Sequence, residues 1–102
     1  MRKLYNHIRQ LVCDEYCVTN EELDSESGKR HIAEARMVAM KLVYEHTEMR
    51  VCQVSYMFGG RGHQCVYNAS GRVMDLCDID PLFKRKYNRV LSAIQKTPQD
   101  LS

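Results

Sequence analysis

The stretch VCQVSYMFGGRGHQCVYNASGRV, residues 51–73, constrains the fold most, because it holds two helical patterns on either side of a glycine-rich corner. In each pattern apolar residues stand three or four positions apart, at the spacing of one helix face. The first pattern comprises Val51, Val54 and Phe58, and the second comprises Val66, Ala69 and Val73. Gly59 supplies the left-handed residue that commonly ends a helix, and Gly60 allows a sharp turn. The stretch predicts a helix-turn-helix, the motif whose second helix places its N-terminal side chains in the major groove of DNA.

Helical patterns also precede this motif. We predict helices over residues 2–16 and 31–46, because apolar residues recur at helical spacing through both segments. Thr19 followed by Glu22 has the spacing of a capping box, which predicts a short helix between these two segments. The polar stretch over residues 24–30 is typical of a loop.

A last helix is predicted to begin at Pro81, because proline suits the first turn of a helix, with Asp80 as its cap. We expect Thr97 and Pro98 to end it. Its inner face is expected to comprise Leu82, Val90, Leu91, Ile94 and either Lys86 or Tyr87. The chain is therefore predicted to be one all-α domain over residues 1–97, a compact helical bundle, with a flexible tail over 98–102.

The positive charge of the chain gathers around the helix-turn-helix. The formal net charge is only +2. Residues 29–72 hold seven basic and three acidic side chains, whereas residues 1–28 hold three basic and six acidic ones. This distribution is typical of a face that contacts a nucleic-acid backbone. A merely solvated surface is the alternative.

The chain lacks the patterns of a disulfide framework, a metal site or an active site. Its cysteines are odd in number, and no further ligand is spaced to join Cys13 and Cys17 in a zinc site, so we expect buried or half-buried free thiols. No phosphate-binding loop is present, and His63 and Cys65 face different directions on one helix, which makes a poor nucleophile–base pair. We expect neither catalysis nor a cofactor.

No segment approaches the apolar length of a membrane span, so no membrane association is expected. The N-terminus, MRKLYNHIRQ, lacks the apolar region of a signal peptide. A cytoplasmic location is therefore expected.

The residues FGGRGHQCVYNASGRV resemble the signature of the C-terminal DNA-binding domain (domain IV) of the bacterial replication initiator DnaA, which runs roughly F-G-G-R-D-H-T-T-V. The matching residues are Phe58, Gly59, Gly60, Arg61, His63 and Val66. The segment KRHIAEARMVAMKLVYE resembles the long helix before that signature, where an A-R-x-x-A-M run is typical. Arg36, Ala39 and Met40 fit that run. The resemblance covers about residues 10 to 95.

This resemblance implies a Trp-repressor-like helix-turn-helix that binds double-stranded DNA, with a role in the regulation of replication or transcription. Replication or regulatory proteins are further possible partners. The ATPase domain of the family has no counterpart in these 102 residues, so we expect no nucleotide. A rival interpretation is a protein-interaction module that keeps the DnaA-like scaffold without binding DNA.

The resemblance also assigns roles to single residues. Arg36 is expected in the minor groove of DNA, where a narrow A·T-rich groove attracts arginine; the alternative is a surface arginine paired with a glutamate of its own helix. His63 either donates to a base or phosphate or caps its helix locally, and Arg61 either bonds a phosphate or caps a neighbouring carbonyl. The expected phosphate contacts are Lys29, Arg30, Arg50 and Arg61, and the expected major-groove readers are His63, Gln64, Cys65 and Asn68.

Three positions depart from the family pattern. Gly62 stands where the family has an acidic residue, and Gln64 and Cys65 stand where it has threonines. Threonine methyls contact thymine, whereas a glutamine amide bonds adenine N6 and N7. The departures predict a retained scaffold with a different recognised sequence.

Overall fold

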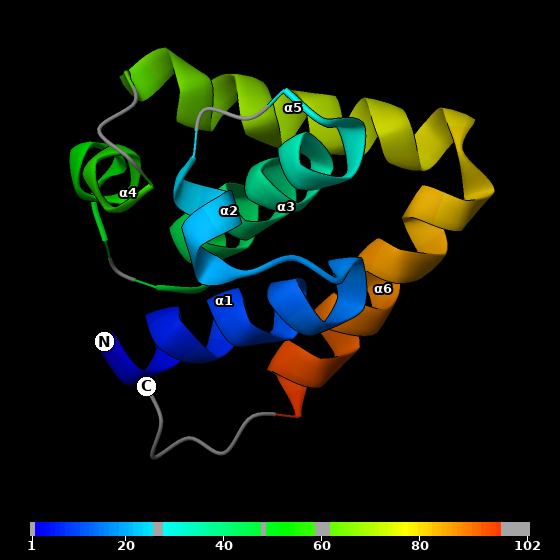
Figure 1. Ribbon diagram of the computed structural model, residues 1–102, viewed down its shortest axis with the longest axis horizontal. Helices are drawn as coiled ribbons and strands as arrows, with labels where there is room; N and C mark the ends of the chain where they lie inside the picture. The colour runs from blue at the N-terminus through cyan, green and yellow to red at the C-terminus, as the bar shows by residue number, and fades with distance from the viewer. Residues whose placement is uncertain (1, 26–27, 48, 59–61, 97–102) are drawn as a thin grey trace.

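The amphipathic segments form six helices in the computed structural model, which describes residues 2–25, 28–47, 49–58 and 62–96. No strand occurs in these residues, so the all-α prediction is confirmed. The helices are α1 Arg2–Tyr16, α2 Asn20–Asp24, α3 Arg30–His46, α4 Val51–Met57, α5 His63–Ile79 and α6 Pro81–Gln95 (Figure 1). The predicted tail, and the end of the last helix at Thr97 and Pro98, lie outside the described residues.

Helix α3 is the centre of the bundle. It packs against α1, α2, α4 and α5, and Figure 1 shows it enclosed between α1 on one side and α5 on the other. Val38, Leu42 and Val43 have no exposed surface, because they lie on the part of α3 that faces these neighbours. Helix α6 closes the bundle by packing against α1 and α5.

Side-chain caps fix where two helices begin. Thr19 Oγ1 accepts a hydrogen bond from the Glu22 backbone N–H at 3.1 Å, and the Thr19 N–H donates to Glu22 Oε1 at 3.0 Å, so the predicted capping box is confirmed. The Asp80 carboxylate accepts from the backbone N–H of Leu82 at 3.1 Å and from that of Phe83 at 3.4 Å. Pro81 follows this cap in the first turn of α6, as predicted.

The predicted inner face of α6 is wrong at its first position. Leu82 is 60% exposed, whereas Phe83 beside it is buried. Because Phe83 faces the core, the positions four, seven and eleven residues after it lie on the same side of the helix and are buried as well. These positions are Tyr87, Val90 and Ile94.

The cysteines are free thiols, but the expectation of burial fails for most of them. Only Cys13 is buried and Cys77 half-buried. Cys17, Cys52 and Cys65 are exposed. Cys17 ends α1 in the left-handed conformation with φ of 56°, and the other two lie on the outer faces of α4 and α5. Within the described ranges, no three His, Cys, Asp or Glu side chains gather as a metal site would require.

None of the described helices combines the length and the apolar character that a membrane crossing demands.

Candidate nucleic-acid interface

Helices α4 and α5 form the predicted helix-turn-helix around a buried seam. Val54 and Phe58 from the first helix, and Val66 and Val73 from the second, are at most 1% exposed. The predicted inner faces are therefore confirmed, and burial of these side chains holds α5 in one rotation. Gly59, Gly60 and Arg61 lie outside the described residues.

The start of α5 is open to solvent. Gly62 occupies the cap position with extended backbone, and it brings no side chain that could accept a bond from the first turn. Its carbonyl accepts the Cys65 backbone N–H at 3.0 Å. Because helix starts carry partial positive charge and unpaired N–H groups, this turn suits an anion better than an acid-capped turn would.

The four predicted major-groove readers share the exposed side of α5. His63, Gln64, Cys65 and Asn68 are all exposed. Gln64 Nε2 donates to Asn68 Oδ1 at 3.1 Å, which joins the two amides one turn apart into a single polar unit. A DNA base that binds either amide would have to share or replace this hydrogen bond.

Two side chains beside these readers were missed in the sequence. Arg72 is exposed four residues after Asn68 and lines, with Cys65 and Asn68, a hollow of about 320 Å³ between α3 and α5. On the other flank, Tyr67 is 51% exposed and packs edge-on against Tyr44 of α3, with ring centroids 6.2 Å apart. The spacing from Asn68 to Arg72 was the signal that could have identified the arginine.

Arg36 lies inside the bundle rather than on its surface. The residue is 8% exposed. Its Nε donates to the Leu23 carbonyl at 3.0 Å, and its Nη2 donates to the Ser25 carbonyl at 2.7 Å. The alternative of a surface arginine is therefore wrong, because the guanidinium bonds the end of α2. The predicted minor-groove contact stays a prediction, and Arg36 also lines the hollow beside Cys65 and Arg72.

The predicted phosphate contacts are not gathered at one place. Lys29 and Arg30 are exposed at the start of α3, where Arg30 Nε lies 3.5 Å from the Glu34 carboxylate and Nη2 lies 3.9 Å from that of Asp80. Asp80 marks the α5–α6 corner, so Arg30 lies toward the far end of α5. Arg50 is exposed immediately before α4, and Figure 1 shows α4 on the opposite side of the molecule from the α5–α6 corner. The described cations therefore do not form one cluster.

A buried arginine of α1, not singled out in the sequence, reaches the end of α4. Arg9 Nη1 donates to Asp24 Oδ1 at 3.0 Å and lies 3.4 Å from the Met57 carbonyl, which also accepts from the Tyr5 hydroxyl at 3.3 Å. The guanidinium stacks 4.9 Å from the Phe58 ring centroid. Burial alone would lower the pKa of Arg9, but the bond to Asp24 and the neighbouring Tyr5 raise it overall. This contact fixes the chain immediately before the predicted turn.

The chain is similar to known proteins over this motif and beyond it. The family model described as the bacterial dnaA protein helix-turn-helix matches residues 5–73. A chromosomal replication initiator protein DnaA from Gloeobacter violaceus is 31% identical over 83 residues, which are 81% of this chain and 19% of that protein. The corresponding protein from Laribacter hongkongensis is 33% identical over 82 residues, 80% of this chain and 17% of that protein. The chain thus spans less than a fifth of the length of these relatives.

Proposed function

Because this chain belongs to the bacterial DnaA helix-turn-helix family, we propose that it binds double-stranded DNA with α5 in the major groove. The observation that carries the proposal is the exposed first turn of α5, held in one rotation by buried Val66 and Val73. The relatives are replication initiators by name. A role in regulating replication or transcription is part of the proposal.

Base reading is assigned to the polar unit of Gln64 and Asn68, with His63 and Cys65 beside it. An amide side chain offers a donor and an acceptor together, which matches the N6 and N7 edge of adenine. The bond between Gln64 and Asn68 supports this assignment, because it orders both amides before DNA arrives. Because Gln64 and Cys65 stand where the family has threonines, we expect this chain to prefer a DNA sequence that differs from that of the relatives.

Affinity is assigned to five cations. Lys29, Arg30, Arg50 and Arg61 are proposed to contact phosphates, and exposed Arg72 is added to them. Five such contacts give a slope of log affinity against log salt of about −4 to −5. Arg36 can enter the minor groove only by exchanging its bonds to the Leu23 and Ser25 carbonyls for contacts with DNA.

The test is fluorescence anisotropy with a mixed-sequence duplex and a DnaA-box duplex at two salt concentrations. Wild-type protein is expected to bind with the salt slope above. Gln64→Ala is expected to lose roughly 1–3 kcal/mol of discrimination between sites. Gln10→Ala is the matched control, because Gln10 is an exposed glutamine on α1 that also bonds a residue one turn later. Arg36→Ala is expected to bind DNA more weakly than wild type.

The rival function is protein binding, and one observation favours it. Tyr44, Tyr56 and Tyr67 are exposed aromatic side chains on the helices of the motif and its neighbour α3. Exposed tyrosines are common at protein interfaces. Absence of DNA binding at low salt, with intact helical structure, would reject the DNA proposal and leave this rival.

A further inference from the structure

Helix α6 carries only positive charge. Its residues, PLFKRKYNRVLSAIQ, include Lys84, Arg85, Lys86 and Arg89 and no aspartate or glutamate, and Lys96 follows at its end. The whole chain has nearly balanced charge, with 15 basic and 13 acidic residues. A helix with only positive side chains is therefore a local concentration of charge, and the folding of the bundle does not require it.

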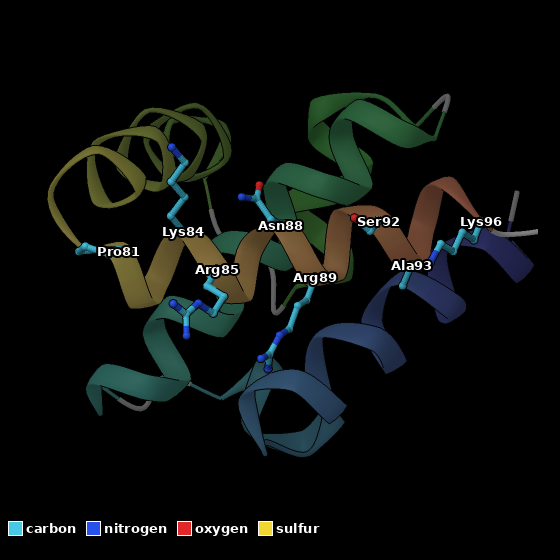
Figure 2. A pocket seen from close by; sticks show the side chains of 8 residues that line it. All are labelled: Pro81, Lys84, Arg85, Asn88, Arg89, Ser92, Ala93 and Lys96. Carbon is cyan, nitrogen blue, oxygen red and sulfur yellow. The ribbon is translucent and has the colours of Figure 1, made fainter.

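Packing places Lys84, Arg85, Arg89 and Lys96 on the solvent side, whereas Lys86 is half-buried against Tyr16. Phe83, Tyr87, Val90 and Ile94 are buried and fix the rotation of the helix. The opposite side follows an open hollow of about 650 Å³, and Figure 2 shows its side chains along the helix. We call this set the α6 face: Pro81, Lys84, Arg85, Asn88, Arg89, Ser92, Ala93 and Lys96.

The charges of the α6 face are weakly compensated. Arg89 Nη1 lies 3.4 Å from Glu15 Oε2, in a pair whose arginine side chain is 64% exposed. Such exposed pairs contribute little and exchange easily. Among the described residues, Lys84 and Arg85 form no ion pair with a carboxylate. From Lys84 to Lys96 the face extends about 18 Å, at 1.5 Å per residue.

The chemistry of the face suits a phosphate backbone better than a protein or a membrane. Hot spots of protein interfaces are enriched in aromatic side chains as well as arginine, and the lining offers no aromatic group and only Pro81 and Ala93 as apolar residues. Membrane-bound helices present a large apolar face to the lipid, whereas the apolar side of α6 is used by the core. Cations interleaved with Asn88 and Ser92 provide the charge and the hydrogen bonds that phosphates accept.

The face is separate from the base-reading turn. The readers stand in the first turns of α5, whereas α6 follows the other end of that 17-residue helix, about 25 Å away by helix rise. Figure 1 likewise places α4 and the start of α5 at one side and the α5–α6 corner at the other. One protein molecule therefore has two surfaces that suit DNA.

We propose that the α6 face is a second, sequence-independent binding site for the phosphate backbone of double-stranded DNA. The site takes a second duplex, which the protein would bridge to the duplex held by α5; contact with the same duplex is the competing outcome of the test. The proposal extends the proposed function but does not depend on which bases α5 reads.

The test compares wild type with the double variant Lys84→Gln, Arg85→Gln. Anisotropy is measured on duplexes of about 12 and 40 base pairs, and a bead-bound duplex is assayed for capture of a labelled second duplex. The reciprocal control is the double variant His63→Ala, Gln64→Ala. Circular dichroism establishes that each variant is folded, which is expected because Lys84 and Arg85 are exposed.

Capture of the second duplex by wild type, lost in the α6 variant, would establish bridging. Without capture, a roughly fivefold loss of affinity confined to the long duplex, with a salt slope shallower by about 2, would place the contact on the same duplex. Equal behaviour of the α6 variant and wild type on all DNA overturns the proposal, as does binding of polyglutamate in preference to DNA. If the His63→Ala, Gln64→Ala variant binds DNA like wild type and the α6 variant does not, the proposed function fails but the proposal for the α6 face holds.

Discussion

The α1–α2–α4 junction and the α6 face both depend on cationic side chains, but they use them in opposite ways. At the junction, Arg9 is buried and its guanidinium is bonded to Tyr5, Asn20, Asp24 and the Met57 carbonyl. On the α6 face, Lys84 and Arg85 are exposed, and the described residues offer them no carboxylate partner. A cation whose bonds are all internal positions the backbone, whereas an uncompensated cation is available to an external anion. Environment, more than residue type, separates the two roles.

The largest expected effect is at the junction. Arg9→Met removes the hydrogen bonds by which the buried guanidinium joins Asn20, Asp24 and the Met57 carbonyl. We expect a loss of about 3 kcal/mol in the free energy of unfolding, measured by urea denaturation. Arg85→Met on the α6 face is the matched control and is expected within about 0.5 kcal/mol of wild type. Similar losses in both variants would remove the distinction between the two regions.

A middle-sized effect is expected at Asp80, which caps the first turn of α6. Asp80→Ala removes the side-chain acceptor for the Leu82 and Phe83 N–H groups. The expected loss is about 1 kcal/mol of unfolding free energy in thermal or urea melts. Asp80→Asn retains a capping oxygen and is expected to recover most of it. A variant as unstable as Arg9→Met would mean that Asp80 does more than cap this helix.

The smallest effect concerns Tyr16, the last residue of α1, with Lys86 Nζ of α6 lying 5.4 Å from its ring centroid. Burial raises the pKa of the Tyr16 hydroxyl, with Glu34 the next contributor. The unfolded chain therefore releases this proton more easily, so the stabilising contribution is complete below about pH 10 and falls as the pH rises above it. Urea melts across this range are expected to show a steeper decline for wild type than for Tyr16→Phe.

At neutral pH, Tyr16→Phe is expected to match wild type within about 1 kcal/mol. The Tyr16 hydroxyl is buried without a hydrogen-bond partner among the described residues, so its removal leaves no acceptor unpaired. A clear loss of stability at pH 7 would contradict this account of the hydroxyl.

The helices could be predicted from the sequence because their signals are local. Apolar spacing identified the buried faces of α1, α3 and α5, and Thr19 and Asp80 were recognised as caps from their neighbours alone. The error at Leu82 arose where two adjacent apolar residues fit a helix face equally well. The packing of α6 against α1 and α5 decides between Leu82 and Phe83, and residue spacing does not contain that packing.

The buried arginines could not be predicted in the same way. Arg9 and Arg36 bond carbonyls at the ends of other helices, and these carbonyls come together only when the bundle has formed. The sequence alone made Arg36 a surface residue, the family resemblance made it a groove contact, and neither gave Arg9 a role. The candidate readers are exposed, as a base-reading role requires, but their exposure does not show which bases they contact.

The bond between the Tyr5 hydroxyl and the Met57 carbonyl joins residues 52 positions apart. Closing so long a loop is costly in chain entropy, so contacts of this separation tend to form late in folding. The end of α4 therefore gains its hydrogen bond to Tyr5 only when α1 has packed against the rest of the bundle. During synthesis α1 leaves the ribosome before α4, so it cannot form this contact until residue 57 has followed, and a product truncated before residue 57 cannot make this bond.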